Sequence, residues 1–427
     1  MKKILLLLVS VTIFSCSKDE SETKKVESVE QPIPEKVFDG YVRLTSQAEV
    51  DAFVEKRYTK INGGLLIGFD NTTSSSNITD ISGLKMLSSA QYLYIGNNTL
   101  LTNLDALFNI KELTDGYLVI KNNAKLENIK GLKNLTQIKG RIEIGDNPAL
   151  VSLEGLEGIR ELSDALIIYG NNIETLKGLG NLEKIGKNLE ITYSQKLKNL
   201  NGLEKLASIG DSFYLWHNDV ITNIDALKAL KSIGGSALFR LNKSLINLDG
   251  FINLASIGKE FSITNNSDGA LISISGLKNL KSNGLVIQII GTELKDFTGL
   301  NAITSAYSLN IQNNSKLKDL TGLDNITAVT AALNIHNCNF ETLKGLNNLK
   351  SIGGNLYIGN SANLVTIDAL QNVASVGGYI KVEGNKSLTS FCGLKELLAK
   401  GLNTDFRVEN NLYNPTIQDI TGNKCSK

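Results

Sequence analysis

Short runs of alternating apolar and polar residues recur along most of this chain at a nearly constant interval. In each run two apolar residues lie two positions apart, as Ile142 and Ile144 do. A period of two with one apolar face predicts a β-strand that buries one side of a sheet. The copies extend from Leu65 to Phe406, so we expect about fifteen such strands.

A second apolar position recurs between these strands and sets the length of the repeat. It is a leucine or phenylalanine that follows glycine or alanine, and its copies are Leu84, Leu107, Leu132, Leu156, Leu179, Leu203, Leu227, Phe251, Leu277, Leu300, Leu323, Leu346, Leu370 and Leu394. Successive copies are 23 to 26 residues apart, which identifies an internal repeat. Because about 24 residues leave no room for a long helix beside the strands, each unit predicts one turn of a coil of strands.

Asparagines follow most of the predicted strands, often in pairs such as Asn97-Asn98 and Asn122-Asn123. Asparagine tolerates the left-handed backbone conformation and bonds nearby backbone groups with its side chain. We therefore interpret these residues as a structural ladder along one corner. A glycine bend after an apolar segment, as in residues 348–353, gives each turn a third side. The pattern predicts an all-β solenoid, a parallel β-helix of about 14–15 turns.

The N-terminus resembles the signal of a bacterial lipoprotein. Lys2 and Lys3 precede an apolar run over residues 4–14, which is too short to span a bilayer as a helix. We expect residues 1–15 to be removed as a signal peptide and Cys16 to be acylated. Several acyl chains on one residue give stable anchoring in a membrane. An ordinary signal peptide or an uncleaved anchor is the alternative.

The residues that follow concern the cellular address and the domain boundaries. Residues 17–20, Ser-Lys-Asp-Glu, resemble the acidic tag that directs lipoproteins of Bacteroidetes-type bacteria to the outer face of the outer membrane. Residues 16–38 are polar and charged, so we expect a flexible tether. The remaining chain is then divided into an N-terminal cap at 39–60, repeats at 61–391, and a C-terminal turn and cap at 392–427.

The predicted N-terminal cap is a helix that covers the first open turn of the solenoid. Ser46 and Glu49 form a capping box, and Val50, Phe53 and Val54 line one face at helical spacing. Without such a cap, the end of a solenoid would expose its core and an unpaired strand edge.

The C-terminal end carries a second set of cap signals. Residues 393–400, followed by Gly401, predict a short helix with a glycine stop. Cys392 precedes this helix and Cys425 lies near the C-terminus. Because an exported protein permits disulfides, we expect a Cys392–Cys425 bond that fastens the closing segment over the last turn. Cys338 occupies a ladder position and is expected to be unpaired.

The repeat resembles the receptor L domain, the right-handed β-helix of insulin-receptor and growth-factor-receptor ectodomains. Residues 44–67 match the opening of such domains, a capping helix followed by I-x-G-x-L-x-I, and the resemblance covers roughly residues 44–425. Leucine-rich repeats are a close alternative, but Ile138 and Ile142 are four residues apart here instead of three. Receptor L domains alternate with Cys-rich modules that this sequence lacks, so the receptors' ligand sites do not transfer.

The composition and the few candidate catalytic or metal-binding residues argue against several classes of function. The chain has 44 basic and 43 acidic residues, which argues against a nucleic-acid-binding surface. His217 and His336 are about five repeats apart and cannot share a metal, so we expect no metal and no cofactor. Some β-helices cleave polysaccharides with clustered carboxylates on long loops, but intervals of at most 26 residues leave little room for such loops. An enzyme is therefore the less favoured hypothesis.

The outward positions of the strands are the candidate binding face. This face comprises Tyr94, Ile167, Tyr169, Tyr214, Trp216, Leu238 and Arg240. Exposed Trp, Tyr and Arg often mark contacts with partners, although ordinary β-propensity at exposed positions is the alternative. We expect a non-catalytic, membrane-anchored interaction protein that binds an unknown protein or carbohydrate. A purely structural component of the cell envelope is the alternative that the sequence does not separate from it.

Overall fold

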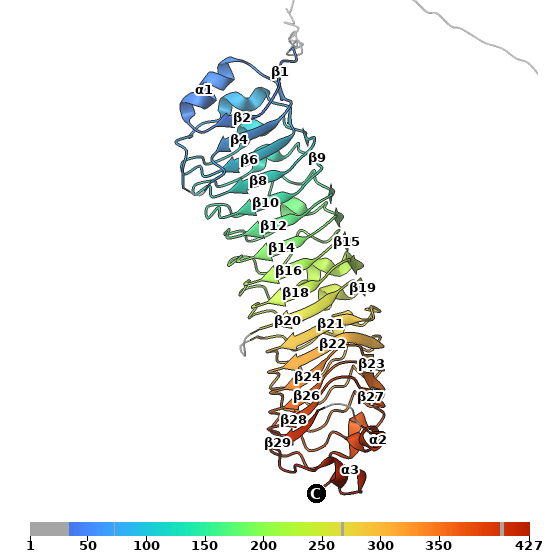
Figure 1. Cartoon of the computed structure of the whole chain (residues 1–427). Coiled ribbons are helices and arrows are strands. Elements are labelled where there is room, and N and C mark those ends of the chain that lie inside the picture. Colours follow the sequence, from blue (N-terminus) through green and yellow to red (C-terminus); the bar gives the residue numbers. More distant parts are fainter. Residues whose placement is uncertain (1–33, 72, 266–268, 402–404) are drawn as a thin grey trace, which may run out of the picture. The chain divides into compact units, whose positions relative to one another are not determined.

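A computed structural model describes residues 34–71, 73–265, 269–401 and 405–427. The chain divides into two units, Met1–Glu35 and Lys36–Lys427, and nearly all described residues belong to the second. The expected signal peptide, Cys16 and most of the expected tether lie outside the described residues. The second unit is a stack of turns built from parallel strands (Figure 1), which confirms the predicted all-β solenoid.

One parallel sheet follows the whole stack and receives one strand from each turn (Figure 1). Its strands in order of pairing are β2 (Val42–Leu44), β4 (Gly64–Gly68), β6 (Tyr92–Gly96), β8 (Leu118–Lys121), β10 (Ile142–Gly145), β12 (Leu166–Tyr169), β14 (Leu189–Thr192), β16 (Phe213–Trp216), β18 (Ala237–Arg240), β20 (Glu260–Thr264), β21 (Leu285–Ile290), β22 (Ser305–Gln312), β24 (Leu333–His336), β26 (Leu356–Gly359), β28 (Ile380–Glu383) and β29 (Phe406–Glu409). We call it the principal sheet. The sequence did not predict β2, which lies within the segment assigned to the N-terminal cap.

The second side of most turns carries a strand of two residues, and most of these strands pair in parallel with the next. They are β1 (Val37–Phe38), β3 (Lys60–Ile61), β5 (Ser89–Ala90), β7 (Glu112–Leu113), β9 (Gln137–Ile138), β11 (Glu161–Leu162), β13 (Lys184–Ile185), β15 (Ser208–Ile209), β17 (Ser232–Ile233), β19 (Ser256–Ile257), β23 (Ala328–Val329), β25 (Ser351–Ile352) and β27 (Ser375–Val376). The long strand β22 pairs with both β23 and β24, so it contributes to two sides. Since β1 pairs with β3, the expected tether ends before Val37 and not at residue 38.

The third side is helical in many turns, which the sequence did not predict. Its 3-10 turns are η1 (Ser82–Met86), η2 (Asp105–Leu107), η3 (Lys130–Leu132), η4 (Lys177–Leu179), η5 (Asp225–Ala229), η6 (Asp249–Phe251), η7 (Ser275–Leu277), η8 (Asp368–Leu370) and η9 (Cys392–Leu394). The glycine before the corner leucine allows successive turns to approach closely. A Cβ atom on Gly131 would lie 1.8 Å from the carbonyl oxygen of Leu104. The backbone therefore excludes any side chain at this position.

Buried asparagines at the end of the principal strands form the ladder that the sequence predicts. The Oδ1 atom of Asn147 accepts a hydrogen bond from the backbone N–H of Asn123 at 3.1 Å. Its Nδ2 atom donates to the Ile120 carbonyl at 2.9 Å and to the Oδ1 atom of Asn171 at 3.2 Å. Each asparagine thus pairs the polar groups of the turn before and the turn after, which would otherwise be buried without partners.

Other residues replace asparagine at several places in this ladder. They include Ser76, Ser194, Thr292, Cys338 and Ser361, and all are buried. The Oγ atom of Ser361 accepts a hydrogen bond from the backbone N–H of Cys338 at 3.4 Å. Cys338 is unpaired and only 4% exposed, and its burial raises the pKa of the thiol to about 11. This thiol is therefore protonated at neutral pH and takes a structural place in the ladder.

The helix α1 (Gln47–Glu55) covers the first turn at the N-terminal end (Figure 1). Val50 is buried beneath α1, and the side chain of Val54 fills the space above Gly83. The Ser46 side chain accepts a hydrogen bond from the Glu49 backbone N–H, as the predicted capping box requires. The Glu49 carboxylate, however, accepts from the backbone N–H of Thr45 at 2.6 Å, one residue earlier than predicted.

The closing segment packs over the last turn at the C-terminal end. It contains α2 (Lys395–Ala399) and α3 (Ile417–Thr421), whose Ile420 is fully buried. Cys392 and Cys425 form a disulfide with Cα atoms 4.8 Å apart. Next to it, the backbone N–H of Phe391 donates to the Cys425 carbonyl at 2.8 Å. The disulfide and this hydrogen bond hold the closing segment against the final turn.

Candidate functional site

The register of the principal sheet places most of the predicted binding residues in two neighbouring columns on its outer face. Ile167, Tyr214 and Leu238 lie in one column, with Glu190 between Ile167 and Tyr214. The second column holds Tyr169, Thr192, Trp216 and Arg240, in that order. We call Ile167, Tyr169, Tyr214, Trp216, Leu238 and Arg240 the strand-face patch. Arg240 is exposed and the other five side chains are half-buried.

Side-chain directions concentrate the patch around Trp216. The rings of Tyr214 and Trp216 meet edge to face, with centroids 5.1 Å apart and planes at 80°. Leu238 and Arg240 flank these rings on the next strand. Such a packed pair of aromatic side chains beside a leucine and an arginine offers the apolar area and the charge that partner contacts commonly use.

Tyr169 leans away from Trp216, towards the N-terminal end of the sheet. Its ring occupies the space above Gly145, where an added Cβ atom would lie 2.0 Å from the ring. Its hydroxyl donates to Oε1 of Glu143 at 3.2 Å. Burial and the neighbouring Glu143 carboxylate raise the pKa of this hydroxyl, so it stays protonated and serves as a donor. Tyr169 is thus held in place by its own sheet and lies at the border of the patch.

The expectation that Tyr94 belongs to the exposed face is wrong. Tyr94 is 8% exposed and packs with Leu66 and Val119, which are 2% and 1% exposed. Its ring covers Gly96, and Lys121 lies 5.6 Å from the ring centroid. The first turns therefore bury a small apolar cluster on the outer face of the sheet. The cause is that three consecutive outward positions are apolar, so their side chains shield one another.

A row of tyrosines borders this cluster along the edge of the principal sheet. Tyr41 stacks on Tyr92 with centroids 6.1 Å apart, and Tyr92 stacks on Tyr117 at 4.7 Å. The guanidinium of Arg141 covers the ring of Tyr117 at 5.3 Å. Burial raises the pKa of Tyr41 to about 12. Because the rings cover one another's faces, we interpret this row as part of the scaffold.

An unusual feature, which was not predicted from the sequence, lies at the corner that follows the principal strands. The residue there has a left-handed backbone in most turns and is usually Asn, Asp or Gly. The residues of these types are Asn97, Asn122, Asp146, Gly170, Gly291, Asn313, Asn337, Asn360, Gly384 and Asn410. Three consecutive turns instead carry Tyr193, His217 and Leu241, with φ of 52°, 54° and 53°. Bulky side chains are strained in this conformation, and such strain gathers at functional sites.

The first two of these corner side chains form a flat stack beside the strand-face patch. The rings of Tyr193 and His217 are 4.6 Å apart with their planes at 7°. Tyr193 is 55% exposed. His217 directly follows Trp216 in the chain, so the stack adjoins the patch. The signal in the sequence is the loss of Asn, Asp or Gly from a position that holds one of them in the surrounding turns.

The residues that the structure describes form neither a candidate metal site nor a helix that could span a membrane. No group of three His, Cys, Asp or Glu residues among them could hold a metal ion. Likewise, none of the helices formed by these residues is long and apolar enough to cross a bilayer. Burial lowers the pKa of His336, whose ring lies 5.6 Å from that of Tyr357.

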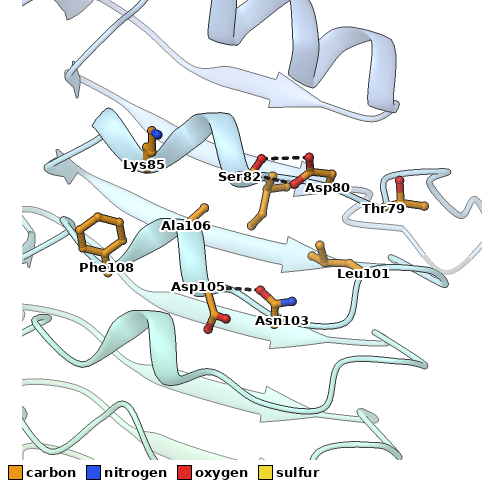
Figure 2. A pocket seen from close by; sticks show the side chains of 10 residues that line it. Thr79, Asp80, Ser82, Lys85, Leu101, Asn103, Asp105, Ala106 and Phe108 are labelled. Carbon is orange, nitrogen blue, oxygen red and sulfur yellow. Dashed lines mark hydrogen bonds between the residues drawn. The ribbon is translucent and has the colours of Figure 1, made fainter.

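A small pocket of about 170 Å³ lies on the third side of the first turns, between η1 and η2 (Figure 2). Two of its polar side chains have partners within the pocket wall. Asp80 accepts hydrogen bonds from the backbone and hydroxyl of Ser82, and Asn103 accepts from the backbone N–H of Asp105. Phe108 is the large exposed apolar side chain at its rim. We interpret this pocket as a space between two successive helical turns.

A family model and several solved structures match this chain. Residues 307–368 match the family model described as the receptor L domain. A leucine-rich-repeat protein of Leptospira interrogans has 17% sequence identity over 86% of this chain and 88% of its own, with a TM-score of 0.37. TLR13 in a complex with a single-stranded RNA has 14% identity over 85% of this chain and 66% of its own, with a TM-score of 0.30. No curated protein sequence matches the chain.

The fold defines the class of the protein. It is a parallel β-solenoid, and one segment of it is similar to the receptor L domain. The family match covers 62 residues of the solenoid, from within β22 to the start of η8. It lies outside the strand-face patch, so the residues of that patch are argued from this chain alone.

Proposed function

We propose that this protein is a non-catalytic, lipid-anchored interaction protein of the cell surface, which binds a protein or glycan through the strand-face patch. The observation that carries the proposal is the aromatic pair Tyr214 and Trp216, flanked by Leu238 and Arg240 on the outer face of the sheet. Each of these residue types is either enriched in binding hot spots or supplies apolar area beside them. The scaffold beneath is rigid, because every turn is paired to its neighbours, and a rigid surface loses little entropy on binding.

The patch is tested by a double substitution, Tyr214→Ser together with Trp216→Ser. The labelled full chain is applied to arrays of glycans and proteins to find the partner that it captures. We expect the double variant to bind this partner at least about thirtyfold more weakly than the wild type, since one hot spot contributes about 2 kcal/mol. The fold should persist, because both side chains lie on the outer face. The matched control is Tyr307→Ser with Tyr379→Ser, two tyrosines that are 52% and 42% exposed elsewhere. Equal capture by both double variants would reject the patch.

The lipid anchor is tested separately at Cys16. The support is the sequence alone: a charged start, a short apolar run and a cysteine before a polar segment. We expect cells fed an alkyne analogue of palmitate to label the wild-type chain, and Cys16→Ser to lose the label and leave the membrane fraction. Protease treatment of intact cells should remove the wild-type chain if it faces outward. Retention of the label by the Cys16→Ser variant would exclude acylation at this residue.

A further inference from the structure

The corner of the solenoid next to the strand-face patch carries an aromatic ring with one open face. One face of Tyr193 is covered by the parallel ring of His217. The pairing order β12–β14–β16 places Gly170 on the opposite side of Tyr193. Gly170 occupies the same corner position and has no side chain. It therefore leaves the second face of the Tyr193 ring uncovered. The 55% exposure of Tyr193 agrees with this arrangement.

A carboxylate borders the same space from the other side. A Cβ atom built on Gly170 would lie 2.1 Å from Oδ1 of Asp146, so this carboxylate lies directly above Gly170. Asp146 belongs to the turn of β10 and Tyr193 to the turn of β14, so their backbones are two strand spacings apart, roughly 9.6 Å. The corner thus has an aromatic face on one wall, a carboxylate on the other, and a bare glycine between them. We call Asp146, Gly170 and Tyr193 the corner site.

We infer that the corner site binds a carbohydrate, whose sugar ring stacks on Tyr193 while its hydroxyl groups donate hydrogen bonds to Asp146. A pyranose has an apolar C–H face and polar hydroxyls around its edge, which matches an open aromatic face next to a hydrogen-bond acceptor. The inference rests on the proposed function in that it places a ligand on the outer surface of these turns. It goes further by giving the class of the ligand and a second set of residues.

Two other ligand classes fit the corner site less well. A quaternary ammonium group is usually held by a cage of several aromatic faces, whereas one face of Tyr193 is open here. A nucleic acid could stack a base on Tyr193, but its phosphates would then lie near the Asp146 carboxylate, and like charges repel. A sugar meets neither obstacle, because it is neutral and needs one face only.

The backbone conformation of Tyr193 supports a role in binding. Asn97 and Asn122 show that an asparagine satisfies this corner without a bulky side chain in the left-handed region. Tyr193 adopts the same conformation at a cost in stability that asparagine does not incur. A residue that strains the backbone and is more than half exposed does not serve the core. The simplest account is that its ring contacts a ligand.

The decisive variant blocks the corner site without removing either of its contact groups. In Gly170→Asn the new Cβ atom would lie 2.1 Å from Oδ1 of Asp146, so the added side chain displaces this carboxylate and fills the gap next to it. Asparagine tolerates the left-handed backbone of Gly170, whose φ is 62°. The matched control is Gly384→Asn. Gly384 has φ of 71°, and its added Cβ atom would lie 2.2 Å from the Oδ1 atom of Asn360, nearly the same contact far from the site.

Binding can be followed by fluorescence, because Trp216 is the single tryptophan of the chain and directly precedes His217. The probes are neutral hexasaccharides of glucose, mannose, galactose and xylose, titrated into the full chain. We expect saturable binding of at least one probe, at least about tenfold weaker binding by Gly170→Asn, and unchanged binding by Gly384→Asn. The inference is overturned if none of the four hexasaccharides binds, or if both variants bind alike. Tetramethylammonium as the better ligand would also overturn it.

A second variant separates binding from stability. Tyr193→Asn introduces the residue type that stands at this corner in other turns, such as those of Asn97 and Asn122. We therefore expect a melting temperature equal to or above that of the wild type, together with at least about tenfold weaker sugar binding. A lower melting temperature with unchanged affinity would show a structural role instead. The proposed function has its own test: it fails if the Tyr214→Ser and Trp216→Ser double variant captures its array partner normally, whatever the corner site binds. Because this variant lacks the tryptophan, its sugar binding is measured by calorimetry.

Discussion

Replacing Asn147 with leucine is expected to lower the free energy of unfolding by roughly 3–6 kcal/mol, because it leaves several buried polar groups without partners. The backbone N–H of Asn123 would lose its acceptor, the Ile120 carbonyl would lose its donor, and Oδ1 of Asn171 would lose one of its donors. Each unsatisfied buried group costs about 1–3 kcal/mol. Urea denaturation measures the lower free energy of unfolding. Because a solenoid unfolds in segments, hydrogen exchange should also become faster in β8, β10 and β12.

The chain itself supplies the control for this experiment. Serine stands in the ladder at Ser194 and Ser361, and the Ser361 hydroxyl accepts a backbone hydrogen bond as an asparagine Oδ1 atom does. We therefore expect Asn147→Ser to cost less than half as much as Asn147→Leu. A surface substitution such as Asn134→Leu, at an exposed residue that bonds the Phe108 carbonyl, should change stability only slightly. If Asn147→Leu cost no more than Asn134→Leu, the ladder would not stabilise the fold.

The strands of the principal sheet could be predicted from the sequence because a period of two leaves only one register that buries the apolar side chains. A shift of one residue would expose every inward side chain, so pairs such as Ile142 and Ile144 fix both the face and the register. The helical third side could not be predicted in the same way. A segment of three residues such as Lys130–Leu132 is too short to show a helical period, and its glycine indicated a bend instead. The strand β2 was not predicted because its three residues are likewise too few to establish a period.

The candidate site was predicted only in part, and the reasons differ between residues. Tyr214 and Trp216 lie where the pattern placed them, since outward positions follow directly from inward ones. Tyr94 is buried because its neighbours Leu66 and Val119 are apolar as well, and periodicity alone does not tell whether an outward column is covered. Tyr193 escaped notice because the corner position was interpreted as purely structural. Its backbone conformation becomes informative only once φ is known.

The aromatic core beneath the strand-face patch leads to the second large expected effect. Phe239 is 1% exposed on the inner face of β18, directly next to Leu238 and Arg240 in the chain. Its ring meets those of Phe213, Phe251 and Phe261 edge to face, at 5.5, 5.8 and 6.5 Å. Truncation to alanine removes these contacts and leaves a cavity in a closely packed core. We expect Phe239→Ala to lower the free energy of unfolding by about 3–5 kcal/mol.

Phe239→Ala should also weaken binding, because the turns that carry the patch rest on this core. Hydrogen exchange in β16, β18 and β20 should rise more than at β26 or β28, since contacts in a solenoid extend only to neighbouring turns. Phe239→Leu, which keeps most of the volume, should cost less than half as much. Phe108→Ala is the surface control, as Phe108 is 39% exposed. A uniform rise in exchange along the whole sheet would contradict the local packing, and with it the idea that each group of turns supports its own stretch of the binding surface.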